Sequence, residues 1–185
     1  MDQNKGLLYR TKAYLIGNLQ DLPEQEGILW REFFSKNVEE MGILCMNPLE
    51  KVFKNFKSLE SKKFRDEMSN LLKTGDLETV HKEFKEIRRR DLAMVDRADF
   101  IVGVLDSRVK TYGVTEELSV SVKQNKAIFL VVKPDLTEIP LWIAGMLKPS
   151  CFFNNLEEII RELKLINSGR KEVDSAYWRI FEDKF

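Results

Sequence analysis

Short, uninterrupted apolar runs recur along the chain and alternate with longer stretches of helical periodicity. The five runs are KAYLIG (12–17), ILCMNP (43–48), ADFIVGVL (98–105), KAIFLVV (126–132) and CFF (151–153). A run that is apolar at nearly every position, rather than at every second one, is typical of a strand that is buried on both faces. The pattern therefore predicts five buried strands of a parallel sheet.

Helices are predicted between these strands. They are expected over about residues 26–41, 77–97, 114–124 and 156–167. Apolar residues recur near helical spacing in the first of them, at Ile28, Leu29, Phe33 and Val38. Gly42 marks the end of that helix, and Asn154 and Glu157 have the spacing of a capping box at the start of the last one.

Strands that alternate with helices indicate a doubly wound α/β domain, flavodoxin-like or Rossmann-like. It would have a five-stranded parallel sheet, helices on both faces and a helical insertion. In such sheets, ligands bind beyond the carboxyl ends of the strands. We therefore expect four residues at these ends to line a binding site, namely Gly17, Asn18, Asn47 and Asp106.

The domain is expected to cover residues 1–167. Within it, residues 49–80 are rich in lysine and aromatic residues and are predicted to form a helical or irregular insertion over one face, or lid. Its basic residues are interleaved with phenylalanines, as in a nucleic-acid-binding segment, and are Lys51, Lys54, Lys57, Lys62, Lys63 and Arg65. Residues 168–185 form an aromatic tail, in which Tyr177, Phe181 and Phe185 recur every four residues and pack on their own domain or on another subunit.

Composition bears on the kinds of partner that the protein can have. The 30 basic and 30 acidic residues cancel, which argues against nucleic-acid or membrane partners and favours a covering role for residues 49–80. The N-terminus lacks the layout of a signal peptide, and no run approaches the length of a membrane span. Cys45 and Cys151 lie in apolar runs, as buried free thiols of a cytoplasmic protein would, and a single histidine, His81, makes a histidine-based metal site unexpected.

Asp91 is out of place in the pattern of the helix predicted over 77–97. The apolar stripe of that helix consists of Phe84, Ile87, Met94, Val95 and Ala98. Asp91 follows Ile87 by four residues and precedes Met94 by three, so it lies on the stripe. Burying a carboxylate is costly unless hydrogen bonds or a charge partner compensate. Two interpretations stay open: an ion pair with a neighbouring arginine, or a carboxylate in a binding pocket.

The two glutamates at the start of the next helix are predicted to differ. At about 100° per residue, Val114, Leu118 and Val122 form one apolar face, with Glu117 at its edge. Glu116 points toward solvent and suits the positive end of the helix dipole. Dipole stabilisation could also explain Glu117, but its place at the carboxyl edge of a strand favours a functional role.

These segments together resemble the nucleoside 2-deoxyribosyltransferase family, which includes relatives that hydrolyse deoxynucleoside monophosphates. The similarity rests on YLIGN (14–18), Asp91 followed by ADFIVGVLD (98–106), and GVTEEL (113–118), and it covers about residues 12–132. It implies that Glu117 is the nucleophile, that Asp91 lies near the nucleobase and that Tyr14 orients the glutamate. It also implies that the backbone contacts substrate at Gly17, Asn18 and Gly113. Tyr112 and Ser119, which depart from the family pattern, complete the expected substrate-binding set.

The reaction implied by this resemblance is cleavage of the N-glycosidic bond of a 2'-deoxynucleoside or its 5'-monophosphate. The deoxyribosyl group would pass to another free nucleobase or, in a hydrolase, to water, without a metal or organic cofactor. Active sites of this family are commonly completed by a neighbouring chain, so a homo-oligomer is expected. Two other functions remain as alternatives. One is a non-catalytic nucleotide-binding or sensing module; the other is an interaction protein that uses residues 49–80 and the tail.

Overall fold

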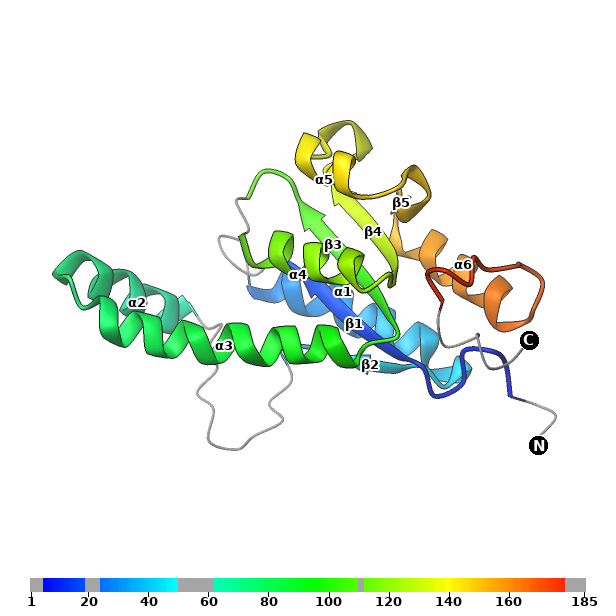
Figure 1. Ribbon diagram of the computed structural model, residues 1–185, viewed down its shortest axis with the longest axis horizontal. Coiled ribbons are helices and arrows are strands. Elements are labelled where there is room, and N and C mark those ends of the chain that lie inside the picture. Colours follow the sequence, from blue (N-terminus) through cyan, green and yellow to red (C-terminus); the bar gives the residue numbers. More distant parts are fainter. Residues whose placement is uncertain (1–4, 19–23, 50–61, 110–111, 179–185) are drawn as a thin grey trace.

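The computed structural model describes residues 5–18, 24–49, 62–109 and 112–178. It contains a sheet of strands β1 (Lys12–Gly17), β2 (Leu44–Met46), β3 (Phe100–Asp106), β4 (Ala127–Lys133) and β5 (Phe152–Phe153). All neighbouring strands pair in parallel, in the order β2-β1-β3-β4-β5 (Figure 1). This confirms the predicted doubly wound, five-stranded α/β fold, and the order is that of flavodoxin-like domains.

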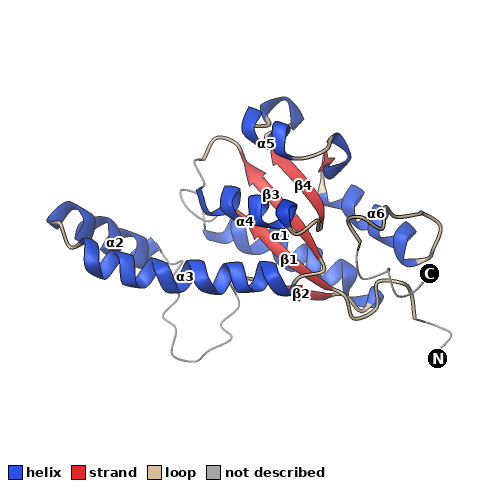
Figure 2. Ribbon diagram, viewed as in Figure 1, coloured by secondary structure: helices blue, strands red, loops and turns tan. Residues whose placement is uncertain are grey.

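Helices cover the sheet on both sides. They are α1 (Glu24–Val38), α2 (Lys62–Thr74), α3 (Leu77–Arg97), α4 (Tyr112–Lys123), α5 (Leu141–Met146) and α6 (Leu156–Asn167), with short 3-10 turns at Glu39–Met41, Leu136–Glu138 and Pro149–Cys151. One layer of the core joins alternate strand residues to α1 and α6, and the other joins the intervening residues to α3, α4 and α5. Figure 2 shows α3 and α4 on the near side of the strands.

The apolar stripe predicted for the first helix is wrong at two positions. Leu29 is 61% exposed and Phe33 is 40% exposed, whereas the buried row of α1 runs through Gly27, Arg31, Phe34 and Val38. The spacing of this row is helical, but glycine and arginine occupy two of its positions. A search for apolar residues therefore places the buried face on the wrong side of the helix.

The predicted cap of the last helix is also displaced by one residue. The N-cap of α6 is Asn155, whose side chain accepts a hydrogen bond from the Glu158 backbone N–H at 2.9 Å. The Glu158 carboxylate accepts in return from the backbone N–H of Asn154, at 3.0 Å. Because two asparagines precede this helix, spacing alone could not choose between them.

Helices α2 and α3 form a hairpin that projects beyond the sheet (Figure 1). Phe64 and Met68 of α2 are buried against Leu71, Val80 and Ile87, and the rings of Phe64 and Phe84 lie 6.2 Å apart. In the part of the predicted insertion that is described, α2 therefore packs on α3. Residues 50–61, which include Lys51, Lys54 and Lys57, lie outside the described residues, and a lid role for this segment stays a prediction.

The start of the aromatic tail packs on its own domain. Trp178 is 5% exposed, with its ring 5.3 Å from that of Phe100 and 5.9 Å from that of Phe129. The Lys148 ammonium lies 4.1 Å from the centre of the Tyr177 ring. Phe181 and Phe185 lie outside the described residues. The tail therefore contributes to the core on the α1 and α6 side of the sheet.

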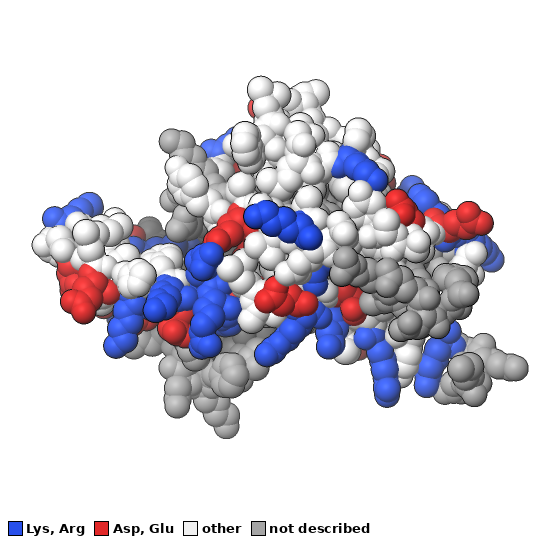
Figure 3. Space-filling view, in the orientation of Figure 1, with Lys and Arg blue, Asp and Glu red and all other residues white. Residues whose placement is uncertain are grey.

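Surface charge is mixed on the face that carries α3 and α4. Figure 3 shows basic and acidic side chains interspersed along α3, whereas the surface over α5 is almost uncharged. Cys45 and Cys151, expected to be buried, are half-buried free thiols: Cys45 lies in the edge strand β2 and Cys151 directly precedes the edge strand β5. No helix among the described residues is long and apolar enough to span a membrane.

Candidate active site

The order of the strands creates a switch point between β1 and β3. The chain leaves β1 toward β2 on one side and leaves β3 toward β4 on the other, so the connections diverge there. Crevices at such points are the usual ligand sites of doubly wound sheets. Gly17 and Asp106, at the carboxyl ends of these two strands, lie at this edge, as the sequence predicts.

Tyr14 and Glu117 meet beside this edge. The Tyr14 hydroxyl donates a hydrogen bond to Oε1 of Glu117, with 3.1 Å between the two oxygens. Tyr14 belongs to the core layer that faces α4 and is 1% exposed. Val114 and Leu118 are buried under α4, which turns Glu117, half-buried, toward the tyrosine. The contact expected from the family resemblance is therefore present.

The environment of Tyr14 keeps its hydroxyl protonated. Burial raises the pKa of Tyr14 well above 10, and the negative charges of Glu117 and Asp91 and the hydrogen bond to Glu117 act in the same direction. A phenol that does not ionise near neutral pH stays a hydrogen-bond donor. Tyr14 can therefore hold the Glu117 carboxylate throughout the physiological range.

Asp91 forms the ion pair with a neighbouring arginine that was one of its two interpretations, and its place in a binding pocket stays a prediction. Its side chain is 14% exposed on α3 and accepts a hydrogen bond from Arg90 Nε at 3.0 Å within an ion pair. Burial nevertheless raises the pKa of Asp91, and the charges of Arg90 and Arg31 only partly oppose this effect. A half-buried carboxyl group with a raised pKa can hold and release a proton closer to neutral pH than an ordinary aspartate.

Glu116, in contrast, belongs to the surface. It forms an exposed ion pair with Arg88 of α3, in which Arg88 Nε donates to Glu116 Oε2 at 2.8 Å. Arg89 pairs with Glu86 on the same exposed face of α3. Glu116 and Glu117 therefore differ in their contacts, as predicted, since one pairs with Arg88 and the other with Tyr14. The first turn of α4 contains no acidic residue, so the role predicted for Glu116 at the helix dipole is wrong. The pair of Arg88 and Glu116 ties α3 to α4.

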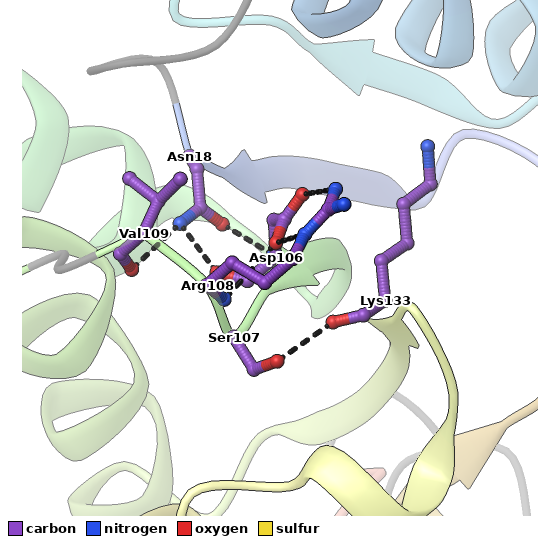
Figure 4. Close-up of polar contacts among 6 residues, drawn as sticks. All are labelled: Asn18, Asp106, Ser107, Arg108, Val109 and Lys133. Carbon is purple, nitrogen blue, oxygen red and sulfur yellow. Dashed lines mark hydrogen bonds and ion pairs between the residues drawn. The ribbon is translucent and has the colours of Figure 1, made fainter.

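Asn18 and Asp106 are joined directly across the switch point (Figure 4). The Asn18 side chain donates to the Asp106 carbonyl at 3.1 Å and to the Val109 carbonyl at 3.4 Å, and it accepts from the Asp106 N–H at 2.8 Å. The Arg108 side chain folds back, and its Nε donates a hydrogen bond to Oδ1 of the buried Asp106 carboxylate at 2.8 Å. This bond is the main cause of the lowered pKa of Asp106. Both side chains thus brace the loop after β3.

The other predicted substrate-binding residues lie around the same edge, without contacts that assign them a role. The Asn47 side chain accepts a hydrogen bond from the Leu49 N–H at 3.0 Å. Tyr112 is 84% exposed at the start of α4, and Ser119 is half-buried further along that helix. The helix was predicted over residues 114–124, after Gly113, but Gly113 lies inside the first turn of α4. The helix thus begins two residues earlier than predicted, and Gly113 has no positive φ that would interrupt it.

Arg31 is the residue of this region that sequence analysis missed. It is fully buried on α1, and its guanidinium donates to the carbonyls of Leu15 and Gly17 in β1. The helical position of Arg31 in the buried row was the only available signal, because no apolar pattern or charge run points to it. Among the described residues, no group of three or more His, Cys, Asp and Glu side chains is placed to hold a metal ion.

Comparison with known proteins supports the fold. No protein-family model and no curated protein matches the sequence. In structure, the chain is similar to the 2-deoxyribosyltransferase of the psychrotolerant bacterium Bacillus psychrosaccharolyticus. The TM-score is 0.54 and the identity 16%, over 81% of this chain and 90% of that chain. The two chains thus share a doubly wound α/β architecture.

Proposed function

We propose that this protein cleaves the N-glycosidic bond of a 2'-deoxynucleoside or its 5'-monophosphate and transfers the deoxyribosyl group to another base. The observation that carries the proposal is the hydrogen bond from buried Tyr14 to Glu117, beside the half-buried Asp91. The structural likeness to a 2-deoxyribosyltransferase and the motifs in the sequence support the same assignment.

Glu117 would be the nucleophile. Its carboxylate would attack C1' of the sugar as the bond from C1' to the base nitrogen breaks, forming a glycosyl ester on the enzyme. The sugar carbon carries positive charge in this transition state, and a deoxyribosyl group, which lacks the 2'-hydroxyl, tolerates that charge better. Tyr14 holds one carboxylate oxygen in place, so the attack starts from a fixed rotamer.

Asp91 would supply the proton that the departing base needs. Burial favours the neutral carboxyl group, and a neutral acid can donate its proton to a ring nitrogen as the electron pair of the glycosidic bond moves onto the base. When a second base attacks the glycosyl ester, the Asp91 carboxylate would take up the proton that this base loses. Glu117 is then released, and the cycle needs no redox partner.

The acceptor distinguishes the two forms of this activity. A free nucleobase gives a transferase, whereas water gives a deoxynucleoside 5'-monophosphate hydrolase. Both use the same glycosyl ester, so the roles proposed for Glu117, Asp91 and Tyr14 hold for either.

A chromatographic assay would test the proposal. The purified protein would be incubated with the four deoxynucleosides and their 5'-monophosphates, each with and without a second free base. Base exchange that requires the acceptor supports a transferase, and base release without it supports the hydrolase. If no substrate is cleaved although ligands still bind, the proposal is wrong and a nucleotide-sensing module is favoured.

A further inference from the structure

Arg31 is a fully buried arginine beside the candidate site that the mechanism above does not use. It is the largest of the fully buried side chains in the described part of the chain, and its guanidinium lies 4.5 Å from the centre of the Trp30 ring. A buried charge costs free energy unless hydrogen bonds and other charges stabilise it. The contacts of the guanidinium therefore indicate what the residue does.

The guanidinium joins α1 to the carboxyl end of β1. Its Nη1 donates to the Gly27 carbonyl at 2.6 Å, one turn earlier in α1. Its Nε donates to the Leu15 carbonyl at 3.2 Å and its Nη2 to the Gly17 carbonyl at 3.3 Å. The planar fork of an arginine fixes the directions of such bonds, which a lysine ammonium does not.

These two carbonyls of β1 point to the side of the sheet on which β2 lies. The Thr11 carbonyl accepts from Leu44, which begins β2, whereas the next carbonyl, that of Lys12, accepts from Asp99, just before β3. Carbonyl directions alternate along a strand. The carbonyl groups of the odd-numbered residues of β1, including those of Leu15 and Gly17, therefore point away from β3 and toward the side of β2.

Strand β2 is too short to reach them. Its last paired residue, Met46, lies opposite Tyr14, while β1 continues to Gly17 against β3. A strand edge with unpaired polar groups is costly when it is buried. Arg31 donates the hydrogen bonds that a longer β2 would have provided along this part of β1.

The fit between Arg31 and the strand is tight. A Cβ atom on Gly17 would lie 2.8 Å from the Val104 carbonyl oxygen, 3.0 Å from Trp30 Cζ2 and 3.2 Å from Arg31 Nη2. Glycine is therefore required for the guanidinium and the indole to approach the strand backbone. The last three residues of β1, which follow Tyr14 directly, are therefore held between β3 and α1.

The charge of Arg31 also acts on the site. It opposes the increase that burial causes in the pKa of Tyr14 and in the pKa of Asp91. Arg90 also acts on Asp91, and the charges of Glu117 and Asp91 also act on Tyr14. Arg31 is thus the positive group that α1 contributes to this site, to which α3 contributes Asp91 and Arg90 and α4 contributes Glu117.

We propose that Arg31 is a positioning residue of the candidate active site, which replaces the missing part of β2 and thereby holds the Tyr14 hydroxyl against Glu117. The expected change in kcat rests on the proposed function. The effect of Arg31 on the position of the Tyr14 hydroxyl does not depend on any activity.

The test compares Arg31→Lys, which keeps the charge but loses the fork, with Arg31→Met, which loses both. Lys36→Met, on an exposed position of the same helix, is the control. We expect kcat of both Arg31 variants to fall by about 10- to 100-fold with little change in KM, because a small displacement of catalytic groups has effects of this size. The Lys36 variant should keep the kcat of the original protein.

A second readout follows the Asp91 carboxyl carbon by NMR during a pH titration, with Asp91→Asn to assign the signal. Arg31→Met should raise the pKa of Asp91, since a positive charge that favours the ionised form is lost, whereas Arg31→Lys should leave it nearly unchanged. A purely structural role would lower the melting temperature of both variants, while the folded protein kept its kcat and its Asp91 titration. That result would overturn the inference.

The two proposals can fail separately. If the original protein cleaves no deoxynucleoside or deoxynucleotide, the proposed function is wrong. The positioning role is then decided by a crystal structure of Arg31→Lys. We expect the distance between the Tyr14 hydroxyl and Glu117 Oε1 to exceed the original 3.1 Å, and an unchanged distance would reject the role.

Discussion

The hydroxyl of Tyr14 and the carboxylate of Glu117 lie 3.1 Å apart although 103 positions separate the two residues in the chain. One residue lies in the middle of the first strand and the other in the second turn of α4. Parallel pairing of β1 with β3 places β1 under α4 and brings the two together. The hydrogen bond between Tyr14 and Glu117 therefore depends on the fold, and removing it should change the rate of the reaction.

Replacing Tyr14 by phenylalanine removes only the hydroxyl that holds Glu117. A hydrogen bond to a charged group contributes about 1.5–3 kcal/mol, so kcat should fall about 10- to 100-fold. KM should change little, because the tyrosine contacts the nucleophile rather than a substrate group. Steady-state kinetics of Tyr14→Phe measure this, with Tyr9→Phe, in the turn that precedes β1, as the control. An unaltered kcat in Tyr14→Phe would separate the tyrosine from the mechanism.

Much of this arrangement is predictable from the sequence. The bounds of β1, α3 and α6 agree with the predicted ranges, because each element has a pattern of its own: a continuous apolar run or an apolar stripe. Helical phase alone places Asp91 on the half-buried stripe of α3 and separates Glu117 from Glu116. The pairing of Tyr14 with Glu117 came from the family resemblance, since no local pattern links residues so far apart.

The features that were missed depend on polar groups in buried places. Arg31 occupies a position where the pattern calls for an apolar side chain, and its carbonyl partners become apparent only once β2 is seen to end early. The hydrogen bonds from the Asn18 side chain to the loop after β3 were not predicted either, while the substrate contact expected at Asn18 stays a prediction. Such roles depend on backbone groups, whose directions a sequence does not reveal.

Asp91 is expected to control the alkaline side of the pH profile. Burial raises its pKa, so the protonated form persists to higher pH than for an ordinary aspartate, and activity should fall as the pH rises through this value. Asp91→Asn should lower kcat/KM by about 10²- to 10⁴-fold and abolish this limb of the profile. A deoxyribosyl substrate whose leaving group needs no proton should be much less affected. Equal losses on both substrates would contradict the role of proton donor.

The same group links stability to pH. Because the pKa of Asp91 is raised above its ordinary value of 3.8 in the folded state, the folded protein binds the proton more tightly than the unfolded chain. The resulting stabilisation is complete below about pH 3.8 and is lost as the pH rises through the folded-state pKa. Urea unfolding of the original protein and Asp91→Asn across this range should show that difference. If the free energies of unfolding of the two proteins changed with pH in the same way, Asp91 would have an ordinary pKa.

Asn18→Ala should destabilise the switch point. The side chain is 2% exposed, and its loss leaves the N–H and carbonyl of Asp106 and the carbonyl of Val109 without this partner. Losses of this kind cost about 1–3 kcal/mol of unfolding free energy, which chemical denaturation can measure. Asn37→Ala removes an exposed asparagine bond to the Phe33 carbonyl and should cost much less. Equal costs would show that the Asn18 bridge contributes little.

The expectation of a homo-oligomer can be tested in solution. The exposed apolar side chains at the start of α5, Leu141 and Trp142, are 90% and 78% exposed and lie where a second subunit would gain from covering them. Size-exclusion chromatography with light scattering should give a mass above 21.7 kDa for the original protein. Replacing Trp142 by serine should shift that mass toward the monomer. A clean monomer at working concentration would reject a stable oligomer.

A covalent bond between Glu117 and the sugar can be detected by rapid acid quenching followed by peptide mass spectrometry. The protein would be mixed with its deoxynucleoside or deoxynucleotide substrate in the absence of an acceptor base. We expect one deoxyribosyl group on Glu117 in the original protein and in Glu116→Gln, since Glu116 pairs with Arg88. In folded Glu117→Gln we expect no adduct and a loss of base release of more than about a thousand-fold. An adduct on another residue, or base release retained in Glu117→Gln, would show that Glu117 is not the nucleophile.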